Sequence, residues 1–194
     1  MEQEKLLERV FDKNPIILMN SWSLLEIEAQ TVLLKKSYKK IHRTKDLAVI
    51  DMETEIISEY HKMKPAASKK LLAMQKAGKK HSFAIEVMLW TQKILFEYDT
   101  DCPVVITGSP RSEDEARALL SFSETLHKQL YVFNIKTEKS TDTRAEIEKY
   151  DNMVNPALRV LSGKQVHILN VEINSKTTHQ SVHDKLLKHI GNVR

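Results

Sequence analysis

The sequence predicts an α/β protein in which a parallel β-sheet lies between two layers of helices. Short, continuously apolar segments alternate along the chain with longer segments of helical periodicity. This alternation is typical of a parallel sheet whose two faces are both covered. The 194 residues, of which 41% are hydrophobic and 29% charged, suit one domain over 1–194 with a sizeable core.

In the first half of the chain, apolar residues that recur every three or four positions predict five helices, over 2–12, 24–38, 51–63, 66–77 and 82–97. Apolar runs at 15–19 and 46–50 predict two strands, the first followed by a polar turn over 20–23. Ser23 and Glu26 have the spacing of a capping box that opens a helix. Pro65 is expected to break one helix and Gly78 to end the next.

The second half continues the alternation with strands at 103–107, 130–135 and 166–173. Helices are predicted over 112–127, 143–162 and 179–190, the first opened by Ser112 and Glu115 and the second followed by Gly163. Residues 136–142 are polar and are expected to form a loop.

Composition excludes several classes of site. The only glycines are Gly78, Gly108, Gly163 and Gly191, too far apart to form a glycine-rich phosphate loop or a dinucleotide fingerprint. The single cysteine, Cys102, excludes an intrachain disulfide and fits a reducing compartment. No apolar run approaches the roughly 20 residues of a membrane span, and the acidic N-terminus lacks the features of a secretory signal. We therefore expect a cytoplasmic protein with no membrane contact.

Two segments carry a family resemblance. Residues 104–119, VVITGSPRSEDEARAL, join a buried strand to a capped helix through a Gly-x-Pro-Arg element, and residues 146–164 carry Tyr150 and Pro156 on a helix. With the order of elements, these segments resemble the adenylate kinase family of nucleoside monophosphate kinases over essentially the whole chain. The resemblance implies a P-loop-kinase-like fold, with 51–85 as the monophosphate-binding subdomain.

It also implies a vestigial monophosphate site, made of Gly108, Pro110, Arg111 and Glu115. For Arg111 a second interpretation stays open, in which it pairs with Glu113 or Glu115 or merely begins the helix.

The departures from the family pattern are extensive. Its glycine loop falls on 21–29, SWSLLEIEA, which has no glycine and places Ile27 near the position of the catalytic lysine. Thr107 replaces the family's aspartate, and the lid is reduced to 136–142, with Arg144 the one candidate for a lid arginine. Phosphoryl transfer depends on such positioning and charge. The sequence thus predicts an adenylate-kinase-like pseudoenzyme without catalytic residues or cofactor.

Such a protein would act as a binding or structural component, for example in the axoneme of a cilium. One alternative is an active nucleoside monophosphate kinase that uses an unusual loop with ATP and magnesium. Another is a basic adaptor that retains weak binding of a monophosphate nucleotide as a regulatory input.

A basic stretch predicts the kind of partner. No acidic residue occurs from His61 to Ile85, while seven lysines do: Lys62, Lys64, Lys69, Lys70, Lys76, Lys79 and Lys80. Such a cluster attracts an acidic protein surface, although a merely solvated helical face has the same pattern. No recognised motif for nucleic acid accompanies it.

Three further features have structural interpretations. His179 and His183 are four residues apart, a spacing that suits a metal ion, but no third ligand is evident and we expect two solvated histidines without metal. Trp90 is expected in the core. Trp22 takes a position of the lost phosphate loop and is expected to fill the vacated nucleotide site.

Overall fold

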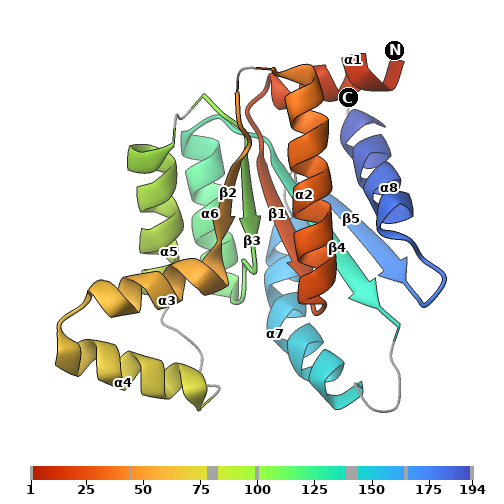
Figure 1. The fold of residues 1–194 in the computed structure, drawn as a ribbon. Coiled ribbons are helices and arrows are strands. Elements are labelled where there is room, and N and C mark those ends of the chain that lie inside the picture. Colours follow the sequence, from red (N-terminus) through yellow and green to blue (C-terminus); the bar gives the residue numbers. More distant parts are fainter. Residues whose placement is uncertain are drawn as a thin grey trace.

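The computed structural model describes residues 2–43, 45–77, 83–98, 101–138, 144–163 and 166–192. The strands within these ranges form one sheet in the order β2-β3-β1-β4-β5, and every neighbouring pair is parallel (Figure 1). The strands are β1 (Ile16–Ser21), β2 (Ala48–Asp51), β3 (Val104–Thr107), β4 (Leu130–Thr137) and β5 (His167–Ile173).

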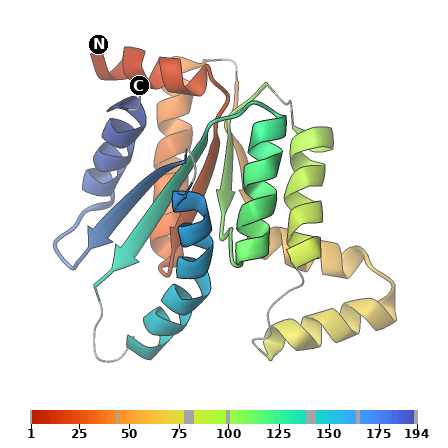
Figure 2. The same cartoon turned by 180° about the vertical axis from the view of Figure 1, so that it is seen from behind.

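Helices cover both faces of this sheet. Helices α1 (Glu2–Phe11), α2 (Leu24–Ile41) and α8 (His179–Asn192) lie on one face. Helices α5 (Phe83–Gln92), α6 (Glu113–Thr125) and α7 (Arg144–Ser162) lie on the other, and a π-helical turn, η1 (Lys93–Glu97), extends α5 (Figures 1 and 2). The predicted three-layer α/β/α architecture is therefore confirmed, and it is consistent with a P-loop-kinase-like fold.

Helices α3 (Met52–Lys62) and α4 (Pro65–Lys76) form an arm at the β2 edge of the sheet (Figure 1). Ile56 and Tyr60 anchor α3 in the core, while α4 packs on α3 and extends away from the sheet. No helix of the described chain is long and apolar enough to cross a bilayer.

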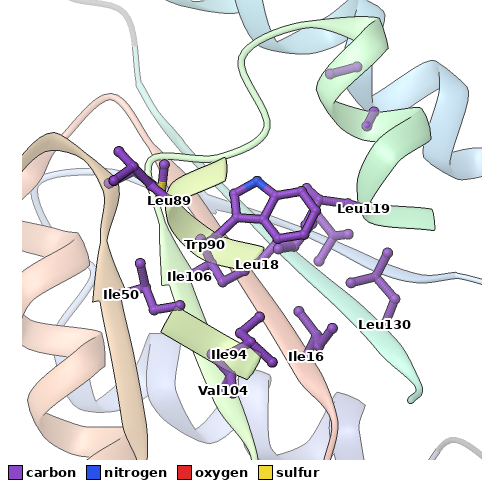
Figure 3. Packing of buried hydrophobic residues seen from close by; sticks show 14 of the residues in the cluster. Ile16, Leu18, Ile50, Leu89, Trp90, Ile94, Val104, Ile106, Leu119 and Leu130 are labelled. Atoms are coloured by element: carbon purple, nitrogen blue, oxygen red, sulfur yellow. The ribbon is translucent and has the colours of Figure 1, made fainter. Parts of the chain in front are cut away.

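Successive side chains of each strand point to opposite faces of the sheet, so a separate hydrophobic core forms on each face. In β1, Ile16 and Leu18 face the α5–α6–α7 layer, where they meet Trp90 and Leu119 (Figure 3). Ile17 and Met19 face the opposite core. Trp90 is only 1% exposed, which confirms its predicted place. The continuous apolar runs in the sequence thus reflect burial on both faces of the sheet.

Two local predictions differ from the structure, and a third lies outside the described residues. Asn20 and Ser21, expected in a turn, complete β1, since both are buried and paired with β4. Pro65 separates α3 from α4 but also begins α4, where the missing N–H of proline is harmless. The predicted end of α4 at Gly78 lies outside the described residues.

Other predicted apolar faces are partly exposed. Leu24, Met88 and Leu95 are 60%, 45% and 39% exposed because their helices turn only one side to the sheet. The helical spacing therefore located the helices but misassigned some of the residues that face the core.

In both predicted capping boxes, only the hydrogen bond that the serine side chain accepts is formed. Ser23 and Ser112 accept the backbone N–H groups of Glu26 and Glu115, at 3.3 and 3.2 Å. The glutamate side chains do not return to the serine backbone. Each is instead drawn into a buried hydrogen-bond network, that of Glu26 with Gln30 and that of Glu115 with Arg111.

Candidate functional site

The carboxyl ends of the strands form the candidate site, since open α/β sheets bind ligands at this edge. A central cleft of about 570 Å³ lies beside the ends of β1, β2 and β3. A lateral cavity of about 450 Å³ lies beside the ends of β4 and β5. Trp22 and Tyr150 line both, so that these two aromatic side chains stand between the two spaces.

The turn between β1 and α2 offers no phosphate loop. β1 ends at Ser21 and α2 begins at Leu24, so only Trp22 and Ser23 connect them. The hydroxyl of Ser21 accepts the N–H of Ser23 at 3.1 Å, and the hydroxyl of Ser23 accepts the N–H of Glu26. A phosphate loop needs several backbone N–H groups that converge on the anion. Here two of the nearest N–H groups are bound by serine side chains, and Trp22 occupies the turn.

Gly108 and Arg111 shape the floor of the central cleft. Gly108 has φ +72°, and a Cβ atom there would lie 3.1 Å from Nη2 of Arg111. The Arg111 side chain folds back over this glycine, and its Nε donates to the Gly108 carbonyl oxygen at 2.8 Å. Both residues line the cleft.

The guanidinium of Arg111 keeps its other N–H groups available. In the part of the chain that the structure describes, no carboxylate lies within ion-pair distance of it. Glu113 pairs with Arg117 instead, at 2.9 Å. Glu115 accepts the backbone N–H of Arg111 at 2.7 Å, not its side chain. The expected ion pair between Arg111 and a neighbouring acid is thus not formed.

Glu115 and Pro110 are buried and do not belong to the lining of the cleft. Glu115 accepts hydrogen bonds from the Ser109 hydroxyl and the Arg111 N–H, and it also bonds to the carboxyl group of Glu86. Burial raises the pKa of Glu115 above its usual 4.5, and the hydrogen bonds from Ser109 and Arg111 oppose this rise. The role of Glu115 is to fix the 109–111 loop from below.

A row of asparagines, which the sequence analysis missed, crosses the sheet at this edge. Asn20, Asn134 and Asn170 lie opposite one another on β1, β4 and β5. Asn134 Nδ2 donates to Asn170 Oδ1 at 2.8 Å. Asn20 is 1% exposed and lines the central cleft, yet its amide nitrogen has no hydrogen-bond partner among the residues that the structure describes. The sequence carried a signal for this row, because an asparagine ends each of three similar, mainly apolar segments: ILMN, YVFN and HILN.

The rim of the central cleft is acidic. Glu28, Asp51 and Glu53 are exposed and line it, and Arg111 is the one cation in its lining. Asp51 caps α3 and accepts from the Thr107 hydroxyl at 3.3 Å, so its carboxylate is held at the strand ends. The lining of the lateral cavity also has more acidic than basic residues, with Lys136 against Glu138, Asp151 and Glu172. Donors therefore lie at the floor of the central cleft, and negative charge lies at its rim.

Tyr150 forms a wall of both spaces. Burial raises the pKa of its phenol, and the nearby charge of Arg111 opposes that rise. Tyr150 is thus a neutral phenol at physiological pH. Trp22, half-buried in the turn between β1 and α2, faces the same two spaces.

A second hollow, the arm groove, has the opposite charge. It measures about 550 Å³ and is lined by residues of α3, α4 and their connection: His61, Met63, Pro65, Ser68, Lys69, Leu72, Ala73 and Lys76. Of the predicted basic face, Lys62, Lys64, Lys69, Lys70 and Lys76 are exposed, while Lys79 and Lys80 lie outside the described residues. Lys62 pairs with Glu59. Lys64, Lys69, Lys70 and Lys76 have no ion pair with any described residue.

Of the two spaced histidines, both predicted to be solvated, His179 is exposed but His183 is not. His183 is 2% exposed, and its Nε2 lies 2.9 Å from the Ser37 hydroxyl. Nδ1 of His179 lies 2.6 Å from the buried carboxylate of Glu26. Both histidines therefore join α8 to α2. Among the described residues, no group of three or more potential ligands could hold a metal ion.

No protein-family model matches this sequence, and no curated protein matches it either. The functional argument therefore rests on the architecture and on the two hollows described above.

Proposed function

We propose that this protein is an adenylate-kinase-like binding protein that does not transfer phosphate from ATP. The observation that carries the proposal is the two-residue turn between Ser21 and Leu24. It contains Trp22 in place of a glycine loop, and serine side chains already accept the N–H groups of Ser23 and of Glu26 in the first turn of α2. Without the cradle for the β- and γ-phosphates, the main source of catalysis in phosphoryl transfer is missing.

The arm groove supports a binding role. Its apolar floor, Met63, Leu72 and Ala73, lies between the cationic side chains of Lys69 and Lys76. An acidic segment of a partner protein with an apolar stripe complements both features, since opposite charges speed association and the apolar contact adds affinity. The partner is thus an acidic protein surface, as the lysine-rich sequence predicts.

A thermal-shift panel with a phosphotransfer assay tests the loss of catalysis. The ligands are ATP, ADP, AMP and a bisubstrate dinucleotide polyphosphate, each with and without magnesium. A ligand at about 100 times its Kd adds about 2.7 kcal/mol to the free energy of unfolding, which shifts Tm by several degrees in a domain of this size. We expect no magnesium-dependent shift and no transfer to AMP. Transfer that Arg111→Ala abolishes would overturn the proposal and support the active kinase.

Fluorescence anisotropy with a labelled, glutamate-rich peptide tests the groove. We expect Lys69→Glu/Lys76→Glu to abolish binding. The matched control, Lys35→Glu/Lys36→Glu, makes the same charge change at exposed positions of α2, on the other layer of the sheet. Equal weakening by both double variants would show that net charge alone drives binding, and the groove would lose its role.

A further inference from the structure

We propose that the central cleft binds a small zwitterion with excess positive charge, such as a free basic amino acid or the C-terminal basic residue of a peptide. The carboxylate of this ligand lies on the floor and its cationic side chain lies at the rim. The inference is independent of the arm groove and of its acidic partner.

The floor is built for an acceptor oxygen. The amide nitrogen of Asn20 is buried without a partner, and Arg111 presents N–H groups beyond the one that Gly108 uses. Both residues line the cleft, and Gly108, over which Arg111 folds, donates its N–H to the carbonyl of Met19, the residue before Asn20. A carboxylate placed here would satisfy the orphaned amide and pair with the guanidinium, both of which favour binding.

The rim selects against a phosphate. A phosphate monoester carries about −1.5 to −2 charges at pH 7. In the cleft it would meet three carboxylates, Glu28, Asp51 and Glu53, against the single guanidinium of Arg111. A carboxylate carries half that charge, and a cationic group on the same ligand turns the three rim acids into partners. A basic amino acid therefore matches the charge of the cleft, which a nucleotide monophosphate does not.

The spacing fits a ligand with separated charges. Asp51 lies opposite Thr107, which lies opposite Met19, so the rim acid and the Asn20 floor are two strand spacings apart, about 10 Å. A carboxylate at Asn20 and a cation at Asp51 must then be several bonds apart, as in arginine or lysine. Trp22 and Tyr150 supply aromatic walls, which attract a guanidinium or ammonium group.

Titration calorimetry with matched ligands tests the assignment. The probes are L-arginine, agmatine, which lacks the carboxylate, L-citrulline, which lacks the side-chain charge, and AMP. We expect L-arginine to bind at least about tenfold more tightly than either of its two analogues, since each has lost a charge-assisted contact. Equal affinity for L-arginine and agmatine, tighter binding of AMP, or no binding of L-arginine at about 10 mM would each overturn the proposal.

Variants locate the two ends of the ligand. Arg111→Met should remove the preference for L-arginine over agmatine. Asp51→Asn should reduce the preference for L-arginine over L-citrulline. Glu113→Gln, an exposed change outside the cleft, is the control and should preserve both preferences. The fluorescence of Trp22, assigned by its loss in Trp22→Phe, should respond to L-arginine. If Arg111→Met and Asp51→Asn both keep the ligand preferences of the wild type, as the control variant does, the ligand binds elsewhere and the assignment fails.

A tripeptide Gly-Gly-Arg and its C-terminal amide separate the two sources of such a ligand. Tighter binding of the tripeptide than of L-arginine, lost on amidation, supports a peptide terminus. Tighter binding of L-arginine supports a free amino acid. Failure of all these ligands would leave the arm groove and the absence of phosphotransfer untouched, so the two proposals fail separately.

Discussion

The central cleft and the arm groove are similar in volume but differ in charge and in construction. The cleft is part of the sheet edge, with a buried polar floor at Asn20 and Gly108 and an acidic rim at Asp51. The groove lies on an arm that extends from the sheet, and exposed lysines surround an apolar floor. The carboxyl ends of the strands, where open α/β sheets bind their ligands, are here the more negative of the two regions.

The largest expected effect concerns the loop that forms the cleft floor. Gly108→Ala should lower the free energy of unfolding by about 1–2 kcal/mol, because φ +72° disfavours any Cβ and the new atom would press on Arg111. Gly163→Ala is the matched control, since its Cβ would lie 3.8 Å from the nearest atom, the Val160 carbonyl oxygen. Urea unfolding measures both. Equal effects would mean that the cleft floor tolerates a side chain.

Two variants of the asparagine row compare an amide that has a hydrogen-bond partner with an amide that has none among the described residues. Asn134→Leu should destabilise the protein by about 1 kcal/mol, because it removes the donor to Asn170. Asn20→Leu should be neutral or stabilising in the absence of ligand, because it removes a buried N–H without a partner. A loss of stability in Asn20→Leu similar to that in Asn134→Leu would contradict the orphaned state of Asn20.

The buried carboxyl beneath the cleft predicts a pH dependence. The raised pKa means that folded Glu115 holds its proton at pH values where the unfolded chain has lost it. The contribution of Glu115 to the free energy of unfolding should therefore be largest at and below about pH 4.5. It should decline as the pH rises through the raised pKa.

Glu115→Gln should flatten that decline, whereas the exposed control Glu113→Gln should leave it in place. Denaturant titrations between pH 5 and pH 8 measure the slopes. The same slope in all three proteins would refute the buried-carboxyl interpretation.

The smallest expected effect concerns the arm. Lys69→Gln/Lys76→Gln should change the free energy of unfolding by no more than about 0.5 kcal/mol, because both side chains are exposed and unpaired among the described residues. The same variant should weaken binding of the glutamate-rich peptide. A marked fall in Tm would indicate that these lysines stabilise the arm and are not reserved for a partner.

The sequence predicted the architecture because periodicity and capping are local. Ser23 and Ser112 begin their helices as expected, and the apolar runs became buried strands. It failed where tertiary contacts decide. Asn20 and Ser21 have the chemistry of a turn, but pairing with β4 extends β1 through them. The side chain of Glu115 was expected near a ligand, and burial against Glu86 turns it inward.

The candidate site was predicted only in part. Gly108 and Arg111, which the motif singled out, do line the cleft, since one short segment fixes both. The asparagine row needed the alignment of three strands far apart in sequence. The acidic rim required knowing that α2 and the end of β2 bring Glu28 and Asp51 to one edge. No single segment carries that information.

The asparagine row also bears on how the sheet assembles. In a parallel sheet of almost uniformly apolar strands, many registers bury similar hydrophobic surface. A slip of β4 by one residue would turn Asn134 toward the opposite core and separate it from Asn170. That misalignment would leave the buried amide of Asn134 among apolar side chains without its partner, at a cost in free energy. The row that ends with Asn20 in the central cleft thus also favours one register of β4 over its alternatives, so residues at the functional edge of the sheet help to specify how the sheet assembles.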